Sequence, residues 1–166
     1  MIIPQLTIRT YGDPCLRKKS VSVDHVGPGE RMLIKAMLAA MYEHKGVGLA
    51  APQVGFNQQI FVVDIGEGPI AVINPRIIKR SGAEKREEGC LSIPGVMLNV
   101  RLPQRIVVKY TDEHNQTVER ELNDLLARVF LHENDHLLGK LIIDYAGLRD
   151  KIKIKKQLHE LIKKQA

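Results

Sequence analysis

Residues 124–138, DLLARVFLHENDHLL, predict a helix around which we expect the rest of the chain to fold. Asn123 or Asp124 suits the N-cap position, and Gly139 suits the position just beyond the end of the helix. One face of the helix carries residues that are four, three and four positions apart: Leu125, Val129, His132 and His136. We therefore expect the two histidines to continue an apolar face that points into the protein.

Within this helix, Glu133 follows His132, and His136 lies four residues after His132. Two imidazoles at this spacing lie one above the other and can bind one metal ion, while the adjacent glutamate can reach a water molecule on that ion. A pair of core histidines held by hydrogen bonds is the alternative interpretation. Because polar side chains on a buried face need a partner, we favour a metal, and with it hydrolysis by metal-activated water.

A catalytic site of this type needs a third protein ligand. A histidine six residues after the second one would fit one protease pattern, but the chain has Ile142 there. Glu160 fits the spacing of another metalloprotease class, yet it lies among lysines, a poor setting for a buried ligand. Cys90 is the third candidate. A cysteine between glycine and apolar residues can also be an inert core thiol, which is what we expect of Cys15.

The rest of the sequence predicts an α+β fold, with antiparallel β-sheets around the metal-binding helix and an amphipathic helix at the C-terminus. An earlier helix is expected from about residue 27 to residue 45, and residues 46–53 are expected to be irregular. The expected strands are rich in branched apolar residues: 59–65, 70–73, 105–110 and 117–122. Because the stretches between them are too short for crossover helices, the strands should be antiparallel.

The C-terminal segment carries most of the net charge of +6, because residues 149–166 contain seven lysines and arginines and two acidic residues. We expect residues 1–148 to form a catalytic metallohydrolase domain and the basic helix 149–166 to belong to the same domain. On a helical wheel, the apolar side chains of this region fill one half: Leu148, Ile152, Ile154, Leu158, Leu161 and Ile162. The helix should dock on the body with its basic face outward, as a solubilising face or as a contact for an acidic partner such as RNA.

Composition and the N-terminal residues exclude several classes of protein. The two cysteines are too few for the disulfide framework of a small secreted domain. Residues 1–5 lack the basic and apolar regions of a signal peptide, and no apolar run reaches the roughly 18 residues that span a bilayer. We therefore expect a cytoplasmic protein with no membrane partner.

Three segments stand out together: GVGLAAPQ at residues 46–53, EGCLS at 88–92 and HENDH at 132–136. In their order and separation they resemble the three signature motifs of the bacterial-type peptide deformylases. YGDP at residues 11–14 and INP at 73–75 are also similar to that family, so the resemblance extends from about Tyr11 to Tyr145.

Two places differ from the family pattern or vary within it. Asn134 stands where the family usually has an apolar residue, which concerns local packing because neighbouring helix positions do not share the face of the ligands. Residues 95–98, GVML, lie in a stretch where family members differ, so substrate contacts there cannot be carried over.

The resemblance implies a metal-dependent hydrolase that removes the formyl group from the N-terminal formyl-methionine of newly made polypeptides. It assigns three residues as metal ligands: Cys90, His132 and His136. Water would take the fourth place on the metal, and Glu133 would be the general base that accepts its proton. Gln53 and the backbone N–H of Leu91 would donate hydrogen bonds to the oxyanion that develops in the reaction.

The resemblance also implies a substrate cleft and a cofactor. Gly48 and Gly89 would let the substrate backbone approach closely, so that the peptide lies like an added strand. Val47, within the first motif, is a candidate for the methionine pocket. Leu125 and Val129 are further candidates from the helical face alone and could equally be plain core. The cofactor would be one divalent ion per chain, Fe(II) by resemblance, with Zn, Ni or Co able to occupy the same ligands.

Two other functions stay open at this point. The chain could be a binding module whose basic C-terminal helix contacts the ribosome, a role that is compatible with catalysis because the substrate emerges there. It could also be a general metallopeptidase, which would cleave internal peptide bonds whether or not a formyl group is present.

Overall fold

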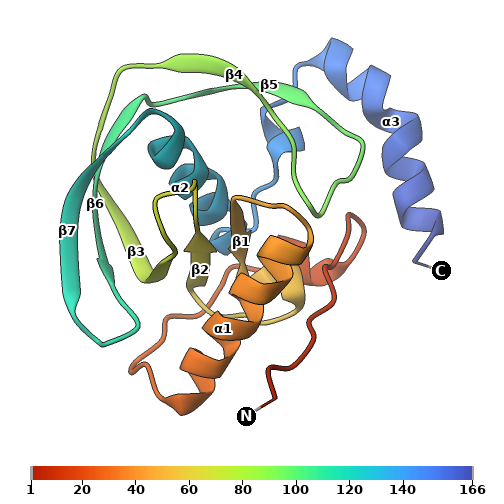
Figure 1. Ribbon diagram of the computed structural model, residues 1–166. Coiled ribbons are helices and arrows are strands. Elements are labelled where there is room, and N and C mark those ends of the chain that lie inside the picture. Colours follow the sequence, from red (N-terminus) through yellow and green to blue (C-terminus); the bar gives the residue numbers. More distant parts are fainter. Residues whose placement is uncertain (1, 166) are drawn as a thin grey trace.

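The main sheet has five strands in the order β1-β2-β3-β6-β7, and a separate sheet pairs β4 with β5 (Figure 1). The computed structural model describes residues 2–165; Met1 and Ala166, the outer ends of the two predicted segments, lie outside the described residues. The strands are β1 (Gly48–Ala50), β2 (Ile60–Val63), β3 (Ile70–Ser81), β4 (Glu84–Glu88), β5 (Leu98–Leu102), β6 (Arg105–Thr111) and β7 (Thr117–Asn123). All neighbouring strands are antiparallel, which confirms the predicted sheet type.

Within residues 2–165, three α-helices accompany the sheets: α1 (Pro28–Glu43), α2 (Asp124–Leu137) and α3 (Leu148–Lys163). Three short 3₁₀ helices complete the fold: Pro14–Arg17, Ala51–Val54 and Ile142–Tyr145. The start of α1 follows from its sequence, because Pro28 fixes φ in the first turn and Glu30 accepts a hydrogen bond of 2.9 Å from Gly27 N–H. No helix within residues 2–165 combines the length and the hydrophobicity that a membrane crossing requires.

The predicted central helix is α2, which lies in the middle of the molecule between the curved main sheet and the strands β4 and β5 (Figure 1). Asn123 occupies its N-cap position, and Gly139 follows its end with φ +72°. Phe130 of α2 packs edge-on against Phe61 of β2, with ring centroids 4.8 Å apart. Burying a side chain of this size contributes about 1.5–3 kcal/mol. The helix that carries both histidines is therefore held by the core.

Three features of the sheets differ from the prediction. β3 continues past Pro75 to Ser81, because Asn74 adopts φ +51° and a shift of register lets the strand resume beside β6. Residues 46–53 are not irregular, since β1 and a 3₁₀ helix occupy this segment. The pair β4–β5 is not predicted, because the β4 sequence EKREE is charged and lacks the alternation of a half-buried strand.

The C-terminal helix α3 begins at Leu148, next to the start of the predicted basic helix, but a narrower face than expected packs on the body. Ile154 and Leu161 are buried and Leu158 is half-buried, so one line of residues makes the contact. The other apolar residues of the predicted half are largely exposed: Leu148, Ile152 and Ile162. α3 lies along one side of the molecule (Figure 1), and a helix in that position touches its neighbours along a single stripe.

Candidate active site

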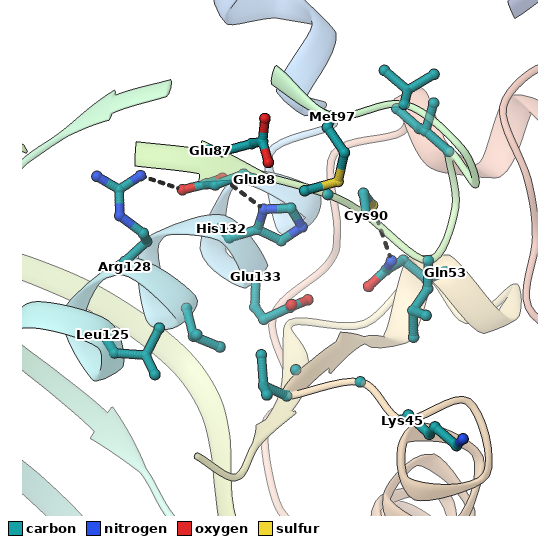
Figure 2. A pocket seen from close by; sticks show the side chains of 18 of the residues that line it. Lys45, Gln53, Glu87, Glu88, Cys90, Met97, Leu125, Arg128, His132 and Glu133 are labelled. Atoms are coloured by element: carbon teal, nitrogen blue, oxygen red, sulfur yellow. Dashed lines mark hydrogen bonds and ion pairs between the residues drawn. The ribbon is translucent and has the colours of Figure 1, made fainter. Parts of the chain in front are cut away.

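A cleft of about 400 Å³ opens beside α2 and receives side chains from three parts of the fold (Figure 2). α2 contributes His132 and Glu133, and the loop after β4 contributes Cys90. The 3₁₀ helix after β1 contributes Gln53. Figure 2 shows these side chains directed toward a common space. Because α2 and β1 are buried, the site is built on rigid elements.

The three predicted metal ligands converge on one point. His132 Nε2 and His136 Nε2 are 3.3 Å apart, and Cys90 Sγ lies 3.4 Å from His136 Nε2. Two nitrogen ligands at about 2.0–2.1 Å from a tetrahedral ion stand about 3.3 Å apart, so the thiolate and the two imidazoles fit a single ion. The alternative ligand, Glu160, lies on α3, where its side chain is 54% exposed beside Lys163. The geometry therefore favours Cys90 as the third ligand.

The two histidines differ in the hydrogen-bond partner of Nδ1, the ring nitrogen that does not face the point where the ligands converge. His132 Nδ1 lies 3.2 Å from Glu88 Oε2, a hydrogen bond in the tautomer that leaves Nε2 free for a metal. For His136, the buried Nδ1 has no hydrogen-bond partner among residues 2–165. The ring of His132 is thus the one whose orientation is set by a carboxylate.

Burial and neighbouring charges shift the pKa values of this site. Burial raises the pKa of Glu133 to about 7, although the charge of His132 works against the rise. Burial, followed by the charge of His132, lowers the pKa of His136 well below its usual value. Burial alone would also lower the pKa of His132, but hydrogen bonds with Cys90 and Glu88 outweigh it and raise that pKa well above 6.5. Burial therefore favours the neutral form of the His136 imidazole, which is the form that binds metal ions.

Gln53 is fixed in one orientation beside Cys90. Its Oε1 accepts a hydrogen bond of 2.8 Å from Ala50 N–H, so its Nε2 must face the other way. There, Nε2 donates to Ser92 Oγ at 3.1 Å and lies 3.6 Å from Cys90 Sγ. The backbone N–H of Leu91 has no hydrogen-bond acceptor within the described part of the chain. Two donors thus lie next to Cys90.

Gly48 lies directly against Glu133. A Cβ added at Gly48 would lie 2.9 Å from both Cγ and Cδ of Glu133, closer than such atoms approach in proteins. The missing side chain of Gly48 therefore makes room for the glutamate, in addition to the predicted close approach of a substrate. β1 is also the terminal strand of the main sheet, so its second edge has no partner strand within residues 2–165.

We expect Gly48→Ala to lower kcat/KM by about 10²-fold, because a displacement of a catalytic group by about 1 Å has a cost of this order. The metal content should stay unchanged, since the three atoms nearest to the added methyl group all belong to Glu133, which is not one of the three ligands. Gly29→Ala is the matched control, because a Cβ at Gly29 meets no atom within 4 Å. Equal activity of the two variants would contradict the role of Gly48 in placing Glu133.

The predicted substrate residues all line the cleft: Val47, Gly48, Gly89 and Val129. Leu125 lines it too, but the expectation that it continues a buried face is wrong. Leu125 is the second residue of α2 and is 43% exposed at the rim of the cleft, where the helix emerges from the core. Asn134 is half-buried and is not among the residues that line the cleft, so its departure from the family pattern does not touch the site.

Sequence reasoning missed two residues behind the metal ligands, Glu88 and Arg128. Both are buried, and they form an ion pair with Nη1 of Arg128 2.5 Å from Oε1 of Glu88. The positions of these two residues relative to the ligands in the sequence could have indicated them. Arg128 precedes His132 by four residues on the helix, and Glu88 precedes Cys90 by two residues at the end of a strand.

Comparisons with known proteins agree with the fold and with the motifs. A sequence profile of the family described as polypeptide deformylase matches residues 5–151. A peptide deformylase of Thermotoga maritima is 44% identical over 93% of this chain and 94% of the relative. One of Clostridium botulinum is 48% identical over 82% of this chain and 93% of the relative. The crystal structure of peptide deformylase from Thermus thermophilus is 39% identical, with a TM-score of 0.91 over 96% of this chain and 98% of the other.

The range matched by the family profile contains all three motifs and every residue described in the cleft. Both sequence relatives are covered over more than nine-tenths of their length, and the Thermus thermophilus structure has the fold of this chain. The resemblance carried by the motifs is thereby confirmed, and the chain belongs to the peptide deformylase family of enzymes.

Proposed function

We propose that this enzyme removes the formyl group from the N-terminal formyl-methionine of newly made polypeptides in the cytoplasm, by metal-dependent hydrolysis. The observation that carries the proposal is the arrangement of the cleft. The Cys90 thiol and two imidazoles converge on one point, with Glu133 and Gln53 directed at the same space. Sites with three protein ligands and an open position are typical of catalytic metals.

A bound divalent ion would supply Lewis acidity, lowering the pKa of a water molecule toward neutrality and polarising the formyl oxygen. The residues that would hold it are Cys90, His132 and His136. We propose Fe(II) as the ion, on the resemblance to the family. Zn, Ni and Co fit a ligand set of one thiolate and two imidazoles equally well.

Glu133 is the proposed general base. It is 3% exposed and lies at the cleft, and its pKa of about 7, raised by burial, suits a group that accepts and returns a proton near neutral pH. It would take the proton of the attacking water and pass it to the amine that leaves. Gly48 leaves the space that this carboxylate occupies.

Two donors are proposed to stabilise the oxyanion that forms from the formyl oxygen. One is Gln53 Nε2, which the hydrogen bond from Ala50 N–H to Oε1 turns toward Cys90. The other is the backbone N–H of Leu91. Both lie beside Cys90 before substrate arrives, and each such donor is worth about 3–4 kcal/mol in the transition state.

The substrate would enter as an extended strand along the free edge of β1. Gly48 and Gly89 line the two sides of its path, and Val47 and Val129 would contact the methionine side chain. The formyl carbon would then reach the deepest part of the cleft, beside Glu133. A general peptidase would need room beyond that point for the residues that precede a scissile peptide bond.

The experiment that tests this function is an assay for formate release from a formyl-methionyl tripeptide, with protein purified without oxygen and supplied with Fe(II) or Ni(II). We expect formate from this peptide, no product from the unformylated peptide, and loss of activity on addition of a chelator. Cleavage of internal peptide bonds without formate release would instead identify a metallopeptidase. Absence of both activities under every metal would contradict the proposal.

We further propose that the basic face of α3 contacts ribosomal RNA, because the lysines and arginines of this helix are all exposed while Ile154 and Leu161 hold it to the body.

Deleting the helix would uncover core residues, so substitution of exposed lysines is the cleaner test. We expect the simultaneous change of Lys151, Lys155 and Lys156 to glutamine to weaken ribosome binding. The plot of log K against log salt concentration should also become less steep, by about one unit of slope for each phosphate that a lysine no longer neutralises. Glutamine at three exposed lysines elsewhere is the control: Lys18, Lys35 and Lys79. An equally large effect in both triple variants would contradict a specific contact.

A further inference from the structure

Arg128 is a buried arginine on the same face of α2 as the metal ligands. It lies one turn before His132 and is only 6% exposed. Arginine is almost never fully buried unless its charge is paired, so its position needs an explanation. None of the roles proposed above uses it.

All the hydrogen bonds of the Arg128 guanidinium go to the two strands β4 and β5. Nη2 donates to Glu84 O of β4 at 2.7 Å, and Nη1 donates to Val100 O of β5 at 3.1 Å. Nη1 also lies 2.5 Å from Oε1 of Glu88, the last residue of β4 (Figure 2). The two carbonyls fix the guanidinium plane, and the plane in turn fixes the Glu88 carboxylate.

The other oxygen of Glu88 reaches the metal centre. Its Oε2 lies 3.2 Å from His132 Nδ1, and His132 Nε2 faces the point where the three ligands converge. The side chains of Arg128, Glu88 and His132 are 7%, 7% and 13% exposed, so these contacts are largely shielded from water although all three residues line the cleft. A chain of buried contacts therefore runs from the carbonyls of β4 and β5 to the metal-binding nitrogen.

We propose that Arg128 is a positioning residue for the metal centre. It holds the Glu88 carboxylate in place, and Glu88 holds His132 in the orientation and tautomer that present Nε2 to the metal. The inference rests on the proposed metal-dependent function. Lysine could not replace Arg128, because a single ammonium cannot satisfy two carbonyls and a carboxylate in one plane.

The test is a double-mutant cycle on metal affinity, measured by competition with a chelator for Co(II) or Zn(II). We expect Arg128→Met to raise the metal Kd by about 10–100-fold, the range found when a partner behind a metal ligand is removed. Glu88→Gln should have an effect of similar size. In the Glu88→Gln background, Arg128→Met should add less than about twofold, because its effect passes through Glu88. A merely structural role would give full, additive effects in both backgrounds.

If Arg128→Met folds poorly, two further variants still test the proposal. The variant with both Arg128→Gln and Glu88→Gln removes both charges of the buried pair, so that neither is left without its partner. We expect the metal Kd of this double variant to match that of Glu88→Gln. The visible spectrum of the Co(II) protein should change in Arg128→Lys, because the spectrum reports ligand geometry directly. An unchanged spectrum together with additive affinities would overturn the inference.

Arg17→Met is the matched control. Arg17 also joins distant segments, with bonds of 2.7 and 3.1 Å to Asp144 and one of 3.3 Å to Gly139 O, but it does not touch a metal ligand. We expect Arg17→Met to lower the melting temperature without changing the metal Kd or the Co(II) spectrum.

A wild-type protein that binds no divalent ion would contradict the proposed function itself. A metal Kd that stays within twofold in Arg128→Met would overturn the role of Arg128 alone.

Discussion

Glu133→Gln is expected to lose activity by about 10²–10⁴-fold while it retains its metal, because the amide keeps the shape of the side chain but cannot accept a proton. Formate release measures the loss, and elemental analysis measures the metal bound per chain. The three proposed ligands do not include Glu133, so the metal content should equal that of the wild type. A variant that keeps more than a tenth of the activity would place the general base elsewhere.

The stability of metal-free Glu133→Gln provides the check that the variant folds. In the wild type, burial raises the pKa of Glu133 from 4.5 to about 7. The folded state therefore keeps a proton that the unfolded state releases, and stability present below pH 4.5 is lost as the pH rises to about 7. At about 1.4 kcal/mol per pKa unit, the loss is about 3 kcal/mol. Above pH 7, the metal-free variant should unfold at higher urea concentration than the metal-free wild type.

Cys90→Ala is expected to abolish metal binding and, with it, formate release. Two imidazoles alone leave a site with one protein ligand too few for a catalytic metal, and the thiolate is the only anionic ligand of the three. Elemental analysis should find metal in the wild type and almost none in the variant. A fully loaded Cys90→Ala protein would remove Cys90 from the ligand set.

Cys15→Ala is the matched control for this variant. The Cys15 thiol donates to Pro52 O at 3.3 Å, and burial followed by the contact with Asp13 raises its pKa to about 11. A thiol that stays protonated is a poor metal ligand, which agrees with the inert role that the sequence suggests for Cys15. We expect Cys15→Ala to keep both metal and activity.

The central helix could be predicted because its pattern is local. The spacing of His132 and His136 places both on one face, and Gly139 marks the end, without any knowledge of the rest of the fold. The approach of Cys90 to that face could not be derived in the same way. It depends on how β4 packs beside α2, and the charged sequence of β4 gives no periodic signal. Only the resemblance of the motifs to a known family joined the two.

Other differences have the same physical origin. The helical wheel of α3 shows which residues are apolar, but the width of the buried contact depends on the shape of the body, and of the apolar residues only Ile154, Leu158 and Leu161 are buried or half-buried. The role of Arg128 is similar. Nothing in the sequence pattern singled it out, because its buried site is created by carbonyls from two strands and by a carboxylate. Such long-range partners are invisible to patterns that span a few residues.

The origin of the three ligands in two distant segments has a consequence for the lifetime of the protein. An ion held by Cys90 and by the histidines of α2 would be a reversible cross-link between the loop after β4 and the central helix. Because these ligands come together only in the folded chain, the bound ion would stabilise the folded state, and this stabilisation would be lost when the ion dissociates. Resistance to proteolysis should therefore rise with the concentration of free metal, so that metal supply would affect how much of this enzyme persists as well as how fast it works.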